Sequence, residues 1–145
     1  MDSRLRIFLI VLLLSIFSHL FAQQEVSWTI STDSKTINYI ADIEDGWHIY
    51  SQYTNPDVGP IPTKFTIKKN NIIRRIGKVI EPAPIKAYDD NFGGDVMYFE
   101  SKAEFTQELI LKSSGYIKGT ITYMVCNDQK CLPPTDVNFE IEIKE

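Results

Sequence analysis

The strongest constraint on the fold is a repeat of two, in which apolar and polar side chains alternate along most of the chain. The alternation is clearest over residues 26–30, 37–43, 117–125 and 137–143. β-Branched and aromatic residues fill many of the apolar positions, as is typical of strands with one buried face. Turn-forming pairs rich in Asp, Asn, Gly and Pro separate these segments. The pattern predicts an all-β, antiparallel β-sandwich of seven to nine short strands.

Three stretches show no clear alternation. Residues 102–112 fit a helix or a strand equally well. Residues 54–62 carry three prolines and are expected to form a loop. Residues 81–94 (EPAPIKAYDDNFGG) contain Pro82 and Pro84, which disfavour a central strand. We expect a second long loop there, and such loops often bind a partner or cover a site.

The first 22 residues have the order of a targeting segment. Two arginines precede an apolar run over residues 7–17, and the segment ends on the small residue Ala22. This order is typical of a secretory signal peptide. A membrane anchor is disfavoured because a span takes about 20 apolar residues, and Ser18-His19 interrupts the run. We therefore expect a signal peptide over residues 1–22, cleavage near Ala22 and one domain over residues 23–145.

The charge of the chain limits its partners. Lys and Arg total 15, Asp and Glu total 19, and the net charge is −4. Binding to nucleic acid needs a surplus of clustered basic residues to neutralise phosphates. The composition therefore argues against nucleic acid as a partner.

The two cysteines of the chain, Cys126 and Cys131, have four residues between them. In an exported protein, two neighbouring cysteines are expected to be oxidised to a disulfide. A bridge across so short a loop adds only about 2 kcal/mol or less to stability, so stability alone is a weak reason for it. The spacing leaves three uses open: a redox-active disulfide, a local staple and a metal site that would still lack ligands.

Three segments carry the most specific motifs: residues 43–50 (IEDGWHIY), 88–94 (YDDNFGG) and 123–137 (YMVCNDQKCLPPTDV). Together, and in this order, they resemble the amino-terminal periplasmic domain of the thiol:disulfide interchange protein DsbD. The resemblance implies an immunoglobulin-like sandwich, a periplasmic location and a redox-active disulfide on a hairpin, with no other cofactor and no metal. The chain departs from the family pattern in having one residue fewer between the cysteines.

The resemblance also implies roles for the two cysteines and for a cap over them. Cys131 would form the mixed disulfide with partners, and Cys126 would resolve it. Phe92 would shield the disulfide, with the flanking glycines absorbing the motion of the loop; its simpler interpretation is a core aromatic residue. Asp90, favoured over Asp89, would lie near the sulfurs and disfavour the thiolate, unless it is a solvated loop charge. The expected cap loop comprises Asp89, Asp90, Asn91, Phe92, Gly93 and Gly94.

A second part of the expected site is a wall formed by His48 and Tyr50. Residues at i and i+2 of a strand share one face, so these two side chains should lie together. His48 stands where the family pattern has a tyrosine, and it could donate a hydrogen bond or a proton. The simpler interpretation is a histidine satisfied in the core or on the surface. Trp47 would point the other way, into the core, where Trp28 is also expected.

These residues together predict a thiol–disulfide interchange component, or protein-disulfide reductase. It would relay electrons from a thioredoxin-like donor to an exported acceptor protein, and a membrane-embedded DsbD-like transporter is a further candidate partner. The main alternative is a binding module of the same fold, in which the disulfide only braces the hairpin. A cysteine hydrolase would need His48 to contact a free thiolate, and it is the third hypothesis.

Overall fold

The computed structural model describes residues 24–144, which form eleven strands and no helix. The expected signal peptide over residues 1–22 lies outside the described residues. Within residues 24–144 there is no helix long and apolar enough to cross a membrane. The strands are β1 (Val26–Thr32), β2 (Thr36–Ile43), β3 (His48–Tyr50), β4 (Lys64–Ile67), β5 (Ile73–Ile80), β6 (Ile85–Asp89), β7 (Gly94–Glu100), β8 (Lys102–Leu111), β9 (Gly115–Tyr123), β10 (Val125–Cys126) and β11 (Thr135–Ile143).

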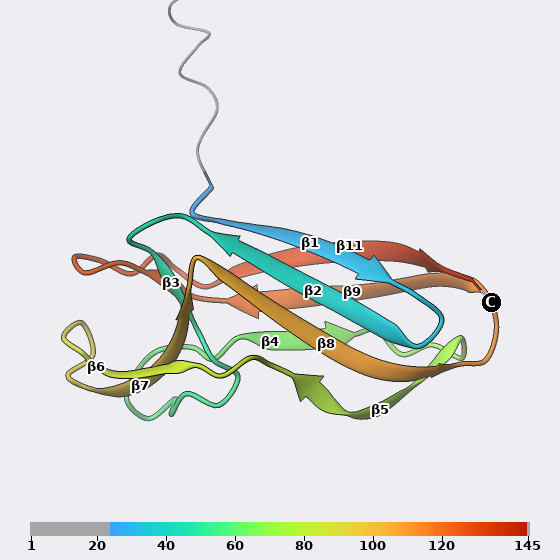
Figure 1. The fold of residues 1–145 in the computed structure, drawn as a ribbon, viewed down its shortest axis with the longest axis horizontal. Helices are drawn as coiled ribbons and strands as arrows, with labels where there is room; N and C mark the ends of the chain where they lie inside the picture. Colours follow the sequence, from blue (N-terminus) through green and yellow to red (C-terminus); the bar gives the residue numbers. More distant parts are fainter. Residues whose placement is uncertain (1–23, 145) are drawn as a thin grey trace, which may run out of the picture.

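The strands form an antiparallel sandwich with a third sheet at one end (Figure 1). One layer has the strand order β1-β2-β8-β5, and the facing layer has the order β11-β9-β4. The third sheet, β10-β3-β7-β6, carries the cysteine hairpin and extends one end of the molecule. The prediction of an all-β, immunoglobulin-like sandwich is confirmed.

The core lies between the two facing layers, where the alternating apolar residues meet. Tyr39 of β2 is paired with Phe105 of β8, so both side chains point to the same face, and both are fully buried. Phe65 from the opposite layer packs on both rings, with centroids 4.6 Å from Tyr39 and 4.9 Å from Phe105. Burial of each such ring contributes about 1.5–3 kcal/mol. Trp28 and Trp47 pack at the edge of this core and are partly buried.

The number of strands exceeds the predicted seven to nine because single residues interrupt segments that look continuous in the sequence. Residues 117–125 alternate without a break, yet Met124 separates β9 from β10, and these strands belong to different sheets. Ser101 separates β7 from β8 in the same way, with a φ of 59°. Of residues 102–112, left open between helix and strand, all but Lys112 form β8.

The expectation of one loop over residues 81–94 is wrong. Residues 85–89 form β6, which is hydrogen-bonded to β7 from Ile85↔Tyr98 to Asp89↔Gly94. The two prolines precede β6, and β6 is an edge strand, so the sheet loses no internal hydrogen bond to them. Only residues 90–93 remain as the turn of this hairpin. Residues 54–62 contain no strand, as expected.

Candidate functional site

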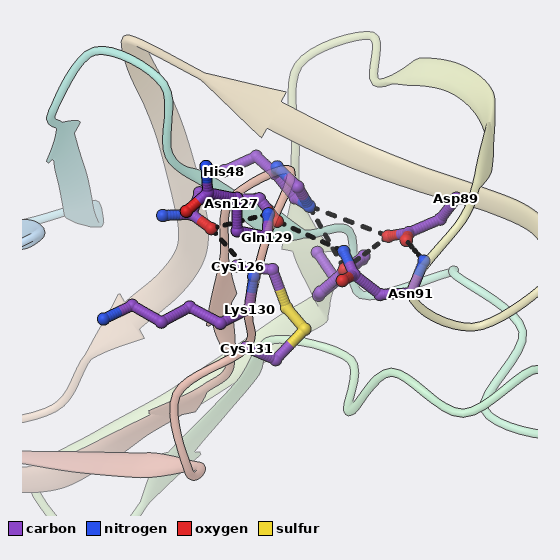
Figure 2. The surroundings of a disulfide bond; sticks show 9 residues. His48, Asp89, Asn91, Cys126, Asn127, Gln129, Lys130 and Cys131 are labelled. Carbon is purple, nitrogen blue, oxygen red and sulfur yellow. Dashed lines mark hydrogen bonds and ion pairs between the residues drawn. A yellow bond between two sulfur atoms is a disulfide. The ribbon is translucent and has the colours of Figure 1, made fainter.

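The centre of the candidate site is the Cys126–Cys131 disulfide, which closes a short hairpin turn (Figure 2). The side-chain Oδ1 of Asn127 accepts hydrogen bonds from the backbone N–H groups of Gln129 and Lys130, both at 2.9 Å. A backbone bond from Leu132 to Val125 continues the hairpin beyond the bridge. Asn127 therefore supplies the turn geometry that brings the cysteines together. The prediction that the two cysteines are oxidised together is confirmed.

The two cysteines differ in their access to solvent. Cys126 is fully buried, in a small cluster with Tyr50 and Val96. Cys131 packs on the same cluster but is only partly buried. An attacking thiolate must approach a sulfur along an open path. Cys131 is therefore the more accessible of the two cysteines.

An aromatic side chain from the β6–β7 turn packs against the disulfide cluster. Phe92 packs against the cluster, and its ring meets the Tyr50 ring edge-on with centroids 6.0 Å apart. Phe92 also lies against Gly59, where an added Cβ would overlap the phenyl ring. Val58, from the same loop as Gly59, also packs against the cysteine cluster. Phe92 is thus held between the cysteine cluster and the loop over residues 54–62.

The acidic residue that anchors this turn is Asp89, whereas Asp90 is exposed. The expectation that Asp90 lies near the sulfurs stays a prediction. Asp89 is buried at the end of β6. Its carboxylate accepts hydrogen bonds from the Tyr50 hydroxyl at 2.7 Å and from the Asn91 backbone N–H at 2.8 Å. Burial alone would raise the pKa of Asp89, but these hydrogen bonds outweigh it and lower the pKa below its usual value.

His48 and Tyr50 share one face of β3, as predicted, and they extend the network from Asp89. Because a carboxylate only accepts, the Tyr50 hydroxyl donates to Asp89, and His48 Nε2–H donates to the Tyr50 oxygen at 3.1 Å. Burial raises the pKa of Tyr50, and the hydrogen bond to Asp89 raises it further. The Tyr98 ring lies 4.7 Å from the His48 ring and closes this wall. The backbone of His48 is paired with Cys126 itself.

One hydrogen bond joins the cap to the cysteine hairpin. The side-chain amide of Asn91 donates to the backbone carbonyl of Asn127 at 3.1 Å (Figure 2). Asn127 directly follows Cys126, so the contact ends one residue from the buried sulfur. The cap loop, the β3 wall and the disulfide therefore form one connected unit.

Burial lowers the pKa of His48, and the negative charges of Asp89, Glu100 and Asp128 oppose this shift only in part. Neutral His48 therefore makes its whole contribution to stability above about pH 6.5, the usual pKa of imidazole in the unfolded chain. This contribution decreases as the pH falls below that value. Between pH 7 and 5, we expect the free energy of unfolding to fall by up to about 1.4 kcal/mol per pH unit. Urea titrations at several pH values measure this slope.

His48→Gln is the matched variant for this prediction, since His48 is the only histidine in residues 23–145. Glutamine keeps a donor but does not titrate, so the slope between pH 7 and 5 should flatten. An unchanged slope in His48→Gln would contradict the assignment.

The sequence analysis missed several residues that build this site. Val58 and Gly59 were assigned only to a loop, although Val58 packs against the disulfide cluster and Gly59 lies against the Phe92 ring. The dipeptide Gly59-Pro60 marks a turn but does not indicate what the turn contacts. Lys130 lies beside Cys131 in the sequence, but its ammonium group sits over the Trp47 ring, 5.8 Å from the centroid. No group of three metal-ligating side chains is found among residues 24–144.

The comparisons with known proteins agree with this geometry. A family model described as the thiol:disulfide interchange protein DsbD, N-terminal, matches residues 18–143. The crystal structure of the reduced Neisseria meningitidis DsbD N-terminal domain superposes with a TM-score of 0.65 and 16% identity, covering 87% of this chain and 91% of that one. The complex of the DsbD and PilB N-terminal domains from Neisseria meningitidis gives a TM-score of 0.63 and 15% identity, with coverages of 84% and 86%. The comparison with curated proteins gives no match.

Proposed function

Because this chain belongs to the family of the amino-terminal domain of the thiol:disulfide interchange protein DsbD, we propose that it relays electrons through Cys126 and Cys131. The observation that carries the proposal is the unequal burial of two bonded cysteines beneath a cap. A disulfide that served only as a brace would need neither a reachable sulfur nor an aromatic cover. The protein would act after export, in the periplasm.

The relay begins with a reduced thioredoxin-like donor. A donor thiolate attacks the sulfur of Cys131, the Cys126–Cys131 bond breaks, and the Cys126 thiolate leaves and takes up a proton. The second donor thiol then attacks the mixed disulfide and releases Cys131. The donor leaves as a disulfide, and this domain holds two thiols, so two electrons have been transferred.

In the second half of the relay, the reduced domain transfers two electrons to an exported acceptor. The Cys131 thiolate attacks a disulfide of the acceptor, and Cys126 then attacks the mixed disulfide from inside the domain. The acceptor leaves reduced, and the Cys126–Cys131 bond forms again. Because Cys126 is already beside Cys131, this second step is intramolecular and fast.

The proposed partners have the thioredoxin fold, and one of them could belong to a membrane-embedded transporter. The solved complex of a related DsbD N-terminal domain with a PilB N-terminal domain supports a protein domain as the direct partner. In this chain, a docking domain would approach Cys131 beside Phe92, so docking and cap movement would take place at the same surface.

A direct test is to equilibrate the protein with glutathione redox buffers and to reduce it with a thioredoxin-like donor. We expect a reduction potential above about −300 mV, because inert structural disulfides lie below that value. We also expect complete reduction by a stoichiometric amount of donor. A potential well below this limit together with no reduction by the donor would identify the disulfide as a brace and leave the binding-module alternative.

A further inference from the structure

A groove of about 870 Å³ opens between β4 and β5, on the side of the sandwich where both facing layers end. Each of these strands is an edge, since β4 pairs only with β9 and β5 only with β8 (Figure 1). The floor of the groove is formed by Phe65, Val79 and Gln107, all of them buried. The Gln107 side-chain amide donates to the backbone carbonyls of Ile76 and Glu108, both at 2.9 Å, so this floor is fixed.

The groove is positively charged, although the chain as a whole carries a net charge of −4. Lys64, Arg75 and Lys78 line it, and its lining contains no Asp or Glu. None of these three cations takes part in the ion pairs found among residues 24–144. The carboxylate of Glu81, beyond the end of β5, is occupied by hydrogen bonds from Ser51 and Gln52. Three unpaired cations around a hollow favour an anionic occupant.

The remaining features favour a polypeptide in an extended conformation. One side of β4 is unpaired over Lys64–Ile67, and its other side is in regular register with β9. Such an edge can accept the backbone of a further strand. Tyr53 and Ile61, which are 51% and 38% exposed, offer apolar contacts to alternate side chains along the same groove. In contrast, the register of β5 shifts between Ile76 and Ile80, so β5 is the poorer edge for pairing.

From these observations we infer that the β4–β5 groove binds an acidic, extended segment of another polypeptide. The backbone of the segment pairs with β4, its carboxylates meet Lys64, Arg75 and Lys78, and its apolar side chains pack on Tyr53 and Ile61. Charged side chains and a bulge also protect sheet edges from aggregation, but protection requires neither a hollow nor an exposed aromatic residue beside it. The groove is distinct from the disulfide site, and none of its lining residues belongs to the cap or the cysteine hairpin.

The test uses the exported, oxidised protein, labelled with ¹⁵N, and an end-blocked synthetic peptide that alternates glutamate with valine. We expect peptide-dependent shifts of the backbone amides of β4 and of the groove-lining residues of β5, with the amides of residues 89–94 unaffected. Replacing Lys64, Arg75 and Lys78 together by Gln should weaken binding about tenfold, since each exposed ion pair contributes modestly. The matched control replaces Lys102, Lys118 and Lys144 by Gln, because these lysines form ion pairs elsewhere.

Two further ligands complete the test. A peptide with glutamine in place of glutamate should bind about tenfold more weakly, and inorganic phosphate should leave the β4 amides unshifted. The inference is overturned if the glutamine peptide binds equally well, if the control variant loses the same affinity, or if phosphate produces the same shifts as the peptide. The last result would reduce the groove to a site for simple anions.

Discussion

A Cys126→Ser variant is expected to accumulate a stable mixed disulfide with an oxidised partner, whereas a Cys131→Ser variant is not. In the first variant the remaining thiol, Cys131, is partly exposed and can attack, and no second thiol is left to release the partner. In the second variant the remaining thiol is fully buried beside Tyr50 and Val96. Electron transfer itself should fall to background in both variants.

The two variants can be compared directly by their rates of reaction with an aromatic disulfide reagent and with a thioredoxin-like partner. We expect Cys126→Ser to react about a hundredfold faster, since a buried thiol must wait for local opening, and each 1.4 kcal/mol of opening slows it about tenfold. Circular dichroism of both variants checks that the sandwich is folded. Equal rates, or adducts formed only by Cys131→Ser, would reverse the assigned order of the cysteines.

A Phe92→Ala variant is expected to be reduced by small thiols about tenfold faster than the natural protein. Phe92 covers the disulfide cluster, and a half-buried phenyl ring contributes roughly 1.4 kcal/mol to the closed state. Its removal exposes Cys131 without touching either sulfur. The rate of reduction by dithiothreitol, followed by mass spectrometry of the alkylated thiols, measures the effect.

Gly59→Ala tests the same cover from its other side, because a Cβ at this position would displace the Phe92 ring. It should raise the reduction rate in the same direction. Two controls separate this effect from general destabilisation: Gly77→Ala replaces another glycine of positive φ, here 63°, with open space around it, and Tyr88→Ala removes an exposed aromatic ring from the same hairpin. If either control accelerates reduction as much as Phe92→Ala, Phe92 is not a specific cover.

The features best predicted from the sequence are the strands and the contacts between residues close together in the chain, because local periodicity determines them. Alternation along residues 37–43 and 137–143 identified two strands, since a strand presents every second side chain to the core. The inner residues are buried in β2, whereas in β11 they are partly buried except for Ile143, which is buried. The Cys126–Cys131 bridge was also predictable, because residues so close in an exported chain meet across a single turn. The proximity of the His48 and Tyr50 side chains followed from the same alternation, because residues at i and i+2 of a strand share one face.

What could not be predicted depends on contacts between residues far apart in the chain. Asp89 and Asp90 are equivalent in composition and neighbours in sequence, and only the pairing of β6 with β7 decides which of them is buried. The contact of Gly59 with Phe92 and the hydrogen bond from Asn91 to Asn127 each join separate loops. No periodic pattern encodes such pairs, so the support of the cap becomes visible only in the structure.

The hydrogen bond from the Asn91 amide to the carbonyl next to Cys126 has a thermodynamic consequence. If displacing the cap changes the equilibrium between disulfide and dithiol by some factor, then reduction changes the equilibrium between closed and open cap by the same factor. A protein that binds only the displaced cap would therefore shift the midpoint potential of the bound domain. Donor and acceptor could then each favour a different oxidation state of the disulfide through the position of the cap, without any additional contact to the sulfurs.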